Sequence, residues 1–214
     1  MDKQHIIINV GRQLGSGGRV IAQQLAKEFD CKFYDRELLN LAAKESGFSE
    51  KFFEQHDEHK LFFKSLFHLH AQHMSDSNFY TNKFSQESLF QFQAQAILKA
   101  ASEGNCVFVG RCADYILRDC PEAVNIFITA DLDHRVAQVA ARHGCDKDAA
   151  LKIIHTKESE RASYYNDYTG KKWGESQSYD LSVNSTLLGL EGTTRLITLF
   201  VKERMAMLRK EAEG

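Results

Sequence analysis

The sequence predicts an α/β fold with three layers, in which a five-stranded parallel sheet is flanked by helices on both faces. Five short apolar segments alternate along the chain with longer amphipathic segments. Such alternation is typical of strands and helices joined by right-handed crossovers. The chain has 214 residues, 43% of them hydrophobic, so it is long enough to bury one core. We therefore expect residues 1–214 to form a single domain with the first strand at the centre of the sheet.

Residues 6–22, IIINVGRQLGSGGRVIA, predict a strand, a glycine-rich loop and a helix in that order. The apolar run at the start is typical of a strand buried on both faces. Glycines at a helix N-terminus let backbone amides approach an anion, which the helix dipole also attracts. The loop therefore predicts a phosphate-binding site, and a flexible turn is the alternative interpretation. The candidate ligands of the phosphate are Gly11, Arg12, Gly15, Ser16, Gly17, Gly18 and Arg19.

This loop departs from the usual phosphate-loop pattern, G-x-x-x-x-G-K-[ST]. Aligned on Gly17, the chain has Gly18 where the lysine belongs and Arg19 where the hydroxyl belongs. Our hypothesis is that Arg19 supplies the missing positive charge, because a guanidinium can bind phosphate oxygens in a bidentate manner. An arginine cannot replace a hydroxyl that contacts Mg²⁺, so the sequence identifies no metal ligands.

The next two predicted strands each bring charged side chains to one edge of the sheet. The short aromatic strand KFY is followed by Asp35 and Arg36. The apolar and hence central strand NCVFVG is followed by Arg111 and Asp114. Ligands of open parallel sheets bind at the carboxyl ends of the strands, so we expect these charges to face a ligand. For Asp35, capping of the helix that follows is an equally good interpretation.

Residues 46–84 are the least regular part of the chain and are rich in phenylalanine. Aromatic side chains at helical spacing are typical of a core or a subunit contact, and this stretch would suit a homodimer interface. An insertion between the second and third strands also lies above the ligand edge of the sheet. The alternative prediction is therefore a mobile segment that closes over a substrate.

The rest of the chain continues the alternation of helices and strands. Residues 85–104 predict a helix with a capping box at Ser85 and an end at Gly104. A polar loop with Lys171 and Lys172 follows later. Further helices are expected from Asp131, within 146–165 and from Gly192 to the end, and further strands over 124–129 and 179–185.

Composition argues against several classes of partner. A net charge of −2 gives no general attraction to a nucleic-acid polymer or an anionic membrane. No apolar run approaches the length of a membrane span, and the N-terminal run is too short for a signal peptide. We therefore expect a cytoplasmic chain. Its five cysteines form no C-x-x-C pair, which is typical of reduced thiols.

Several segments together resemble the nucleoside monophosphate kinases, and most closely the cytidylate kinase-like family of bacteria. The similar stretches are GRQLGSGGR, FYDRELL, VFVGRCADYIL, FITADLDHRV, ERASYYNDYTGKKWG and YDLSVNSTLLG, which fall within residues 6–190. The resemblance implies a P-loop kinase fold with strand order 2-3-1-4-5. It also implies transfer of the γ-phosphoryl group of ATP to a nucleoside monophosphate, with CMP or dCMP first among the candidates, and a requirement for Mg²⁺.

The resemblance implies roles for residues on both sides of the transferred group. Gly15 to Arg19 are similar to the segment that cradles the phosphates of ATP. Asp35 and Arg36 match the region that contacts the monophosphate nucleotide. Arg111 and Asp114 match the segment that grips the phosphate of that nucleotide and reads its base.

Two further segments take a role from the resemblance. Residues 160–178 are similar to a lid, whose charged residues here are Arg161, Lys171 and Lys172, and residues 46–84 would be a helical insertion on the acceptor side. Phosphoryl transfer depends mostly on positioning and on cancelling charge, which converging arginines can do. The candidate catalytic residues are accordingly Arg19, Arg111 and Arg161.

Two other functions stay open at this level. A kinase-shaped chain that lacks the loop lysine could bind nucleotides without turning them over. The same chemistry could also act on an acceptor that is not a nucleotide. The nucleotide-binding protein would differ from the first hypothesis in showing no turnover. The kinase with another acceptor would differ from it only in the acceptor pocket.

Overall fold

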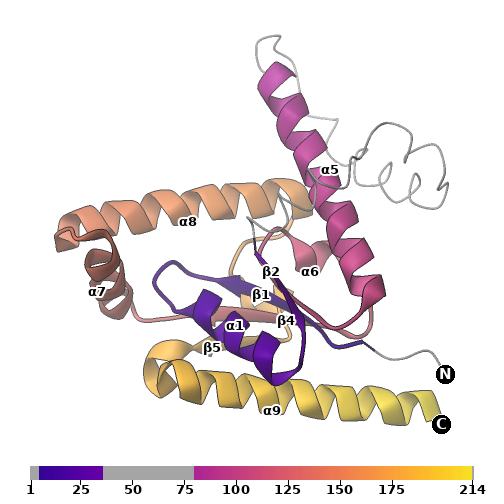
Figure 1. Ribbon diagram of the computed structural model, residues 1–214. Coiled ribbons are helices and arrows are strands. Elements are labelled where there is room, and N and C mark those ends of the chain that lie inside the picture. The colour runs from indigo at the N-terminus through magenta and orange to yellow at the C-terminus, as the bar shows by residue number, and fades with distance from the viewer. Residues whose placement is uncertain (1–4, 36–79, 214) are drawn as a thin grey trace.

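A computed structural model describes residues 5–35 and 80–213, which form a three-layer α/β structure (Figure 1). The described strands form one parallel sheet in the order β2-β3-β1-β4-β5. This confirms the predicted five-stranded sheet and its order, with the first strand at the centre. The strands are β1 (Ile7–Arg12), β2 (Lys32–Tyr34), β3 (Cys106–Val109), β4 (Ala123–Thr129) and β5 (Leu181–Asn184).

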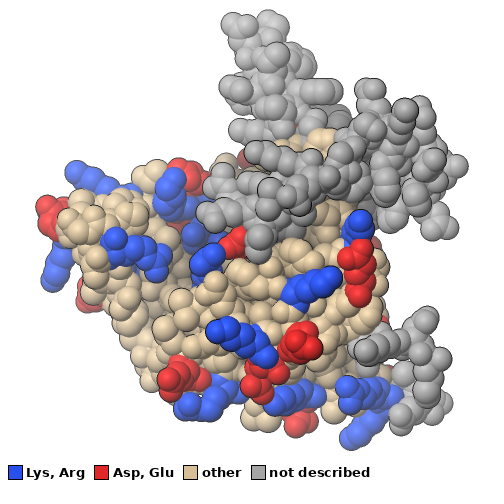
Figure 2. Space-filling view, viewed as in Figure 1, with Lys and Arg blue, Asp and Glu red and all other residues tan. Residues whose placement is uncertain are grey.

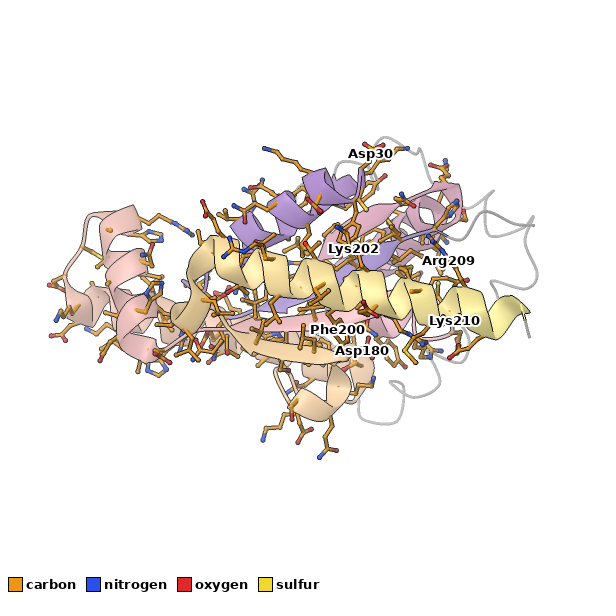
Figure 3. The ribbon with its side chains drawn as sticks, turned by 90° about the horizontal axis from the view of Figure 1, so that it is seen from below. Asp30, Asp180, Phe200, Lys202, Arg209 and Lys210 are labelled. Atoms are coloured by element: carbon orange, nitrogen blue, oxygen red, sulfur yellow. The ribbon has the colours of Figure 1, made fainter. Side chains whose placement is uncertain are left out.

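Helices cover both faces of the sheet. In Figure 1, α8 and α5 lie above the sheet and α9 lies below it, with α1 on the same side as α9. Figure 3 shows α9 running beside α1, where Lys202 of α9 pairs with Glu28 of α1 at 2.9 Å. The described helices are α1 (Gly18–Glu28), α5 (Tyr80–Glu103), α6 (Ala113–Ile116), α7 (Leu132–His143), α8 (Lys147–Thr169), the 3₁₀ turn η2 (Ser176–Ser178) and α9 (Ser185–Glu213).

The central strand β1 is buried on both faces, as its apolar run predicts. Ile8 and Val10 belong to the core under α1 and α9, whereas Ile7 belongs to the core under α5 and α6. Successive side chains of a strand point to opposite faces. Asn9 therefore shares the face of Ile7, and it lies buried, with its Nδ2 donating to Asn125 Oδ1 of β4 at 2.8 Å.

Two predicted helix boundaries are wrong, and both errors have a local cause. The helix predicted from Ser85 begins at Tyr80, because no glycine or proline between these positions ends the helix. The closing helix begins at Ser185 rather than Gly192. Its first turns are broken by Gly189, which has φ +64° and non-helical geometry, and this glycine interrupts the periodic pattern in the sequence.

Other boundaries agree with the sequence. Asp131 is the N-cap residue of α7, and the stretch 146–165 forms the cap and most of one long helix, α8. Asp146 caps α8, since its Oδ1 accepts the amide of Ala149 at 2.8 Å. Most of the insertion predicted over 46–84, and with it the predicted homodimer contact, lies outside the described residues, and so does Arg36. The single-domain and lid assignments stay predictions.

No helix of the described ranges combines the length and the apolar character needed to cross a membrane. On the face seen in Figure 2, basic and acidic side chains are interspersed over the described surface.

Candidate functional site

A cleft of about 620 Å³ opens at the carboxyl ends of β1 and β3. After β1 the chain crosses to β2 on one side of the sheet, and after β3 it crosses to β4 on the other side. The cleft therefore lies at the topological switch point, where α/β sheets bind ligands. Helix α8 and the loop after it close the other side of the cleft. Its lining includes Gly11, Arg12, Arg111, Asp114, Arg161 and Tyr165.

The glycine loop between β1 and α1 has left-handed turns at two positions. Gly15 has φ +83° and Gly17 has φ +73°. A Cβ on Gly15 would stand 2.7 Å from the backbone oxygen of Arg135, so only glycine fits there. The amides of Gly15 and Gly17 have no hydrogen-bond partner among the described residues. Unpaired amides at the start of a helix can bind an anion.

Ser16 holds this loop together from within. Its hydroxyl donates to the carbonyl of Gln13 at 2.9 Å and accepts the amide of Gly18 at 3.4 Å. The hydroxyl of Ser185 in turn donates to the carbonyl of Ser16 at 2.7 Å, and both serines are buried. The loop is therefore fixed before any ligand binds, which lowers the entropic cost of binding.

Three arginines converge on the cleft beside this loop. Arg12 is the last residue of β1, and burial together with the nearby Arg161 and Arg111 lowers the pKa of its guanidinium to about 9. Burial also lowers the pKa of Arg161, against the raising effect of Glu158. Arg161 Nη1 donates to the carbonyl oxygen of Arg12 at 3.0 Å. Such crowding of partly buried positive charge favours a ligand that carries several negative charges.

The backbone after β3 is strained in a way that places Arg111. Gly110, Arg111 and Cys112 all have left-handed φ, of +74°, +60° and +56°. The two residues with a Cβ cost about 1 kcal/mol or more each in this conformation. The Arg111 guanidinium lies 4.6 Å over the ring of Tyr164, and the Tyr164 hydroxyl donates to Gln93 Oε1 at 3.1 Å. Strain and stacking together hold the Arg111 side chain at the cleft.

Asp114 lies half-buried in the same cleft. The hydroxyl of Tyr165 donates to its Oδ2 at 2.7 Å. Burial raises the pKa of Asp114, and the hydrogen bond from Tyr165 and the charge of Lys171 only partly oppose this. Because a protonated carboxyl can donate as well as accept, Asp114 can recognise a polar ligand in either protonation state.

The raised pKa of Asp114 predicts a pH-dependent stability. Above that pKa the folded chain must hold a partly desolvated carboxylate that the unfolded chain exposes to water, so this contribution to stability is lost as pH rises through it. We expect Asp114→Asn to melt at a higher temperature than the parent at pH 7, because asparagine still accepts from Tyr165. Melting curves from pH 4 to 8 should show the difference in melting temperature between variant and parent shrink as the pH falls. A difference that does not depend on pH would contradict the raised pKa.

Arg19 does not line the cleft in this structure. Its Nη2 and Nε bind Asp35 Oδ2 at 2.6 and 3.1 Å. The Arg19 side chain is 57% exposed and that of Asp35 only 7%. The arginine that lines the cleft beside the loop is instead Arg12, which is half-buried. The predicted roles of Arg19 in binding the phosphates of ATP and of Asp35 in binding the acceptor nucleotide stay predictions. The sequence assigned these residues to different ligands, and in the structure they are paired with each other.

The loop after α8 is docked on the sheet. Gly170 ends the helix, and Lys171 and Lys172 follow it exposed to solvent. The amide of Trp173 donates to Asn166 Oδ1 at 2.8 Å, and the Trp173 ring meets Phe127 of β4 edge-on at 5.3 Å. The lysines stand next to a wall of the cleft rather than in it, and their role as lid residues stays a prediction.

Mg²⁺ has no ready-made site in the part of the chain that the structure describes. No group of three or more His, Cys, Asp or Glu side chains gathers there. The hydroxyl of Ser16, the one in the loop, is already engaged with Gln13 and Gly18. Protein-bound Mg²⁺ commonly takes most of its ligands from water and substrate phosphates. The described residues therefore offer Mg²⁺ no site made of protein ligands alone.

Sequence reasoning missed Glu158 and Tyr164. Glu158 Oε1 accepts the amide of Leu14 at 3.1 Å and Arg135 Nη1 at 2.7 Å. The available signal was the helical spacing from Glu158 to Arg161 and Tyr164, which places the three on one side of α8.

A central first strand, a glycine loop and a ligand cleft at the switch point place this chain in the class of P-loop kinase folds. A shikimate kinase from Bacteroides thetaiotaomicron shares this fold, with a TM-score of 0.50 at 11% identity over 92% of this chain and 98% of that one. The chain belongs to the cytidylate kinase-like family, whose family model matches residues 7–187.

Relatives of similar length support this placement. The cytidylate kinase of Pyrococcus horikoshii is 25% identical over 199 residues, which cover 92% of this chain and 88% of that protein. The cytidylate kinase of Methanocaldococcus jannaschii is 24% identical over 200 residues, covering 90% and 96%. An uncharacterized protein from Eubacterium ventriosum superposes with a TM-score of 0.71 at 28% identity, covering 94% of this chain and 99% of that one.

Proposed function

We propose that this chain is an ATP-dependent kinase that transfers the γ-phosphoryl group to a nucleoside monophosphate, CMP or dCMP before others. Membership of the cytidylate kinase-like family makes a nucleotide phosphotransferase the best-supported class. The observation that carries the proposal is the crowding of Arg12, Arg111 and Arg161 at one cleft beside the glycine loop. Two polyanions that react with each other need this kind of charge.

Each side of the cleft suits one partner in the reaction. The amides of Gly15 and Gly17 with Arg12 would hold the β- and γ-phosphates of ATP. Arg111, which follows β3, would hold the phosphate of the acceptor, and Asp114 would contact its base. Arg161 stands on α8 next to Arg12 and would neutralise the charge of the group in transfer. Mg²⁺, brought in with ATP, would shield the phosphates.

A turnover assay tests this proposal. ATP and Mg²⁺ are supplied with CMP, dCMP, UMP, AMP, GMP or shikimate, and ADP is measured. We expect ADP formation that depends on the acceptor and is fastest with CMP or dCMP. No acceptor-dependent ADP with any compound would overturn the kinase proposal, and a preference for a non-nucleotide would overturn the acceptor.

One observation favours a second candidate, a nucleotide-binding protein without turnover. The position of the loop lysine is held by the buried Gly18, and Arg19, the next residue in the chain, is engaged with Asp35. Calorimetry separates the two candidates, since the binding protein would take up ATP or CMP and consume neither. A cytoplasmic location and the lack of a nucleic-acid partner stay predictions.

A further inference from the structure

We infer that Glu158 is a positioning residue, which fixes the glycine loop to helix α8 and so sets the shape of the anion cradle. That the anion is the phosphate tail of ATP rests on the proposed function. The contacts of Glu158 themselves come from the fold.

One oxygen of Glu158 joins three segments. Oε1 accepts the amide of Leu14 in the glycine loop at 3.1 Å and Nη1 of Arg135 in α7 at 2.7 Å. Nε of Arg135 donates to the carbonyl of Ala130 at 3.0 Å. The side chains of Arg135 and Glu158 are only 8% and 19% exposed. Water therefore competes weakly for these contacts, and each is stronger than it would be on the surface.

The contact with Leu14 reaches the cradle directly. Leu14 immediately precedes Gly15, whose left-handed turn and unpaired amide begin the cradle. The backbone of Arg135 packs against Gly15, where a Cβ would stand 2.9 Å from the Arg135 Cα. Glu158 thus holds both the residue before the turn and the residue against which the turn is packed.

Helix α8 makes a second contact at the end of β1, where the glycine loop begins. Arg161, three residues after Glu158 and on the same side of the helix, donates to the carbonyl of Arg12 at 3.0 Å. Tyr165 of the same helix lines the cleft and binds Asp114. A ligand that displaces α8 would therefore displace the loop with it, because one rigid element contacts both.

A pair of double variants isolates the contact with Leu14. Arg135→Met combined with Glu158→Gln keeps an amide oxygen for the Leu14 N–H, whereas Arg135→Met combined with Glu158→Met offers none. Neither leaves Arg135 or Glu158 as an unpaired charge, and both remove the negative charge of Glu158 from the vicinity of Arg161, so these effects cancel in the comparison. Glu28→Gln, which removes a surface ion pair between α1 and α9, is the control and should match the parent.

We expect the KM for ATP to be about tenfold higher in the Met/Met variant than in the Met/Gln variant, the effect of one unpaired buried donor. The KM for CMP should differ by less than about twofold, because the acceptor side does not contact Leu14. The Leu14 amide should also exchange its hydrogen faster in the Met/Met variant. Equal KM values for ATP and equal exchange rates would overturn the positioning role.

The two readouts separate this inference from the proposed function. If the parent chain forms no ADP, the kinase proposal fails. The exchange rate of Leu14 and the affinity for inorganic triphosphate, measured by calorimetry, then decide the role of Glu158. Faster exchange with weaker triphosphate binding in the Met/Met variant supports it, and no difference between the two double variants refutes it.

Discussion

Substitution of Arg12 by methionine should lower turnover by about 10²-fold or more, the magnitude known for groups that stabilise charge in phosphoryl transfer. The same variant should melt at a higher temperature than the parent when no ligand is bound. Methionine keeps the packing of the aliphatic stem against Gly18 and removes a partly buried cation that is close to Arg161 and Arg111. Activity and ligand-free stability are expected to move in opposite directions.

The gain in stability should depend on pH in a defined direction. The pKa of Arg12 is lowered from 12.5 to about 9, so between these values the unfolded chain binds the proton that the folded chain has released. The penalty for the charged group is therefore present below pH 9 and shrinks as pH rises above it. Melting temperatures of parent and variant should converge from pH 7 to pH 10. Arg142→Met, at an exposed position of α7, is the control and should change neither activity nor the pH profile.

Substitution of Gly15 by alanine should destabilise the fold by about 2–4 kcal/mol, since it adds both a forced left-handed φ and a collision. The new Cβ would lie 2.7 and 2.9 Å from the backbone oxygen and Cα of Arg135. Backbone atoms in α7 cannot swing away as a side-chain tip can, so the loop must distort. Turnover should fall more than the folded fraction does, because the distorted segment is the cradle.

Gly104→Ala provides a matched control. No atom lies within 4 Å of the Cβ that it would add, and Gly104 does not have a left-handed φ. Denaturant titration should place its free energy of unfolding within about 1 kcal/mol of the parent. Equal losses in the two alanine variants would show that the packing of Gly15 against Arg135 has no special weight.

The sheet could be predicted from the sequence because each strand is a short apolar run bounded by turn residues. The run before Gly11 and the run before Gly110 are buried on both faces, and only central parallel strands have that pattern. Helix boundaries were less predictable. Gly189 interrupts α9 without ending it, and sequence periodicity cannot distinguish a kinked helix from two separate elements.

The site was predictable in its location and less so in its contacts. The rule that charges at strand ends gather at one edge predicted a ligand site near Arg111 and Asp114, and both line the cleft in the structure. Arg12, predicted as part of the glycine loop, lines the same cleft. Which basic residue lies beside the loop depends on the direction of each side chain. Here Arg19 forms an ion pair with Asp35 and does not line the cleft. The Leu14 contact of Glu158 joins residues 144 positions apart in the sequence, and no local pattern encodes it.

A crystal structure with ADP and CMP bound tests the central claim most directly. The account predicts the β-phosphate of ADP against the amides of Gly15 and Gly17, within hydrogen-bond distance of Arg12, and the phosphate of CMP against Arg111. Nucleotides bound elsewhere, with Arg12 and these amides contacting no phosphate, would contradict it.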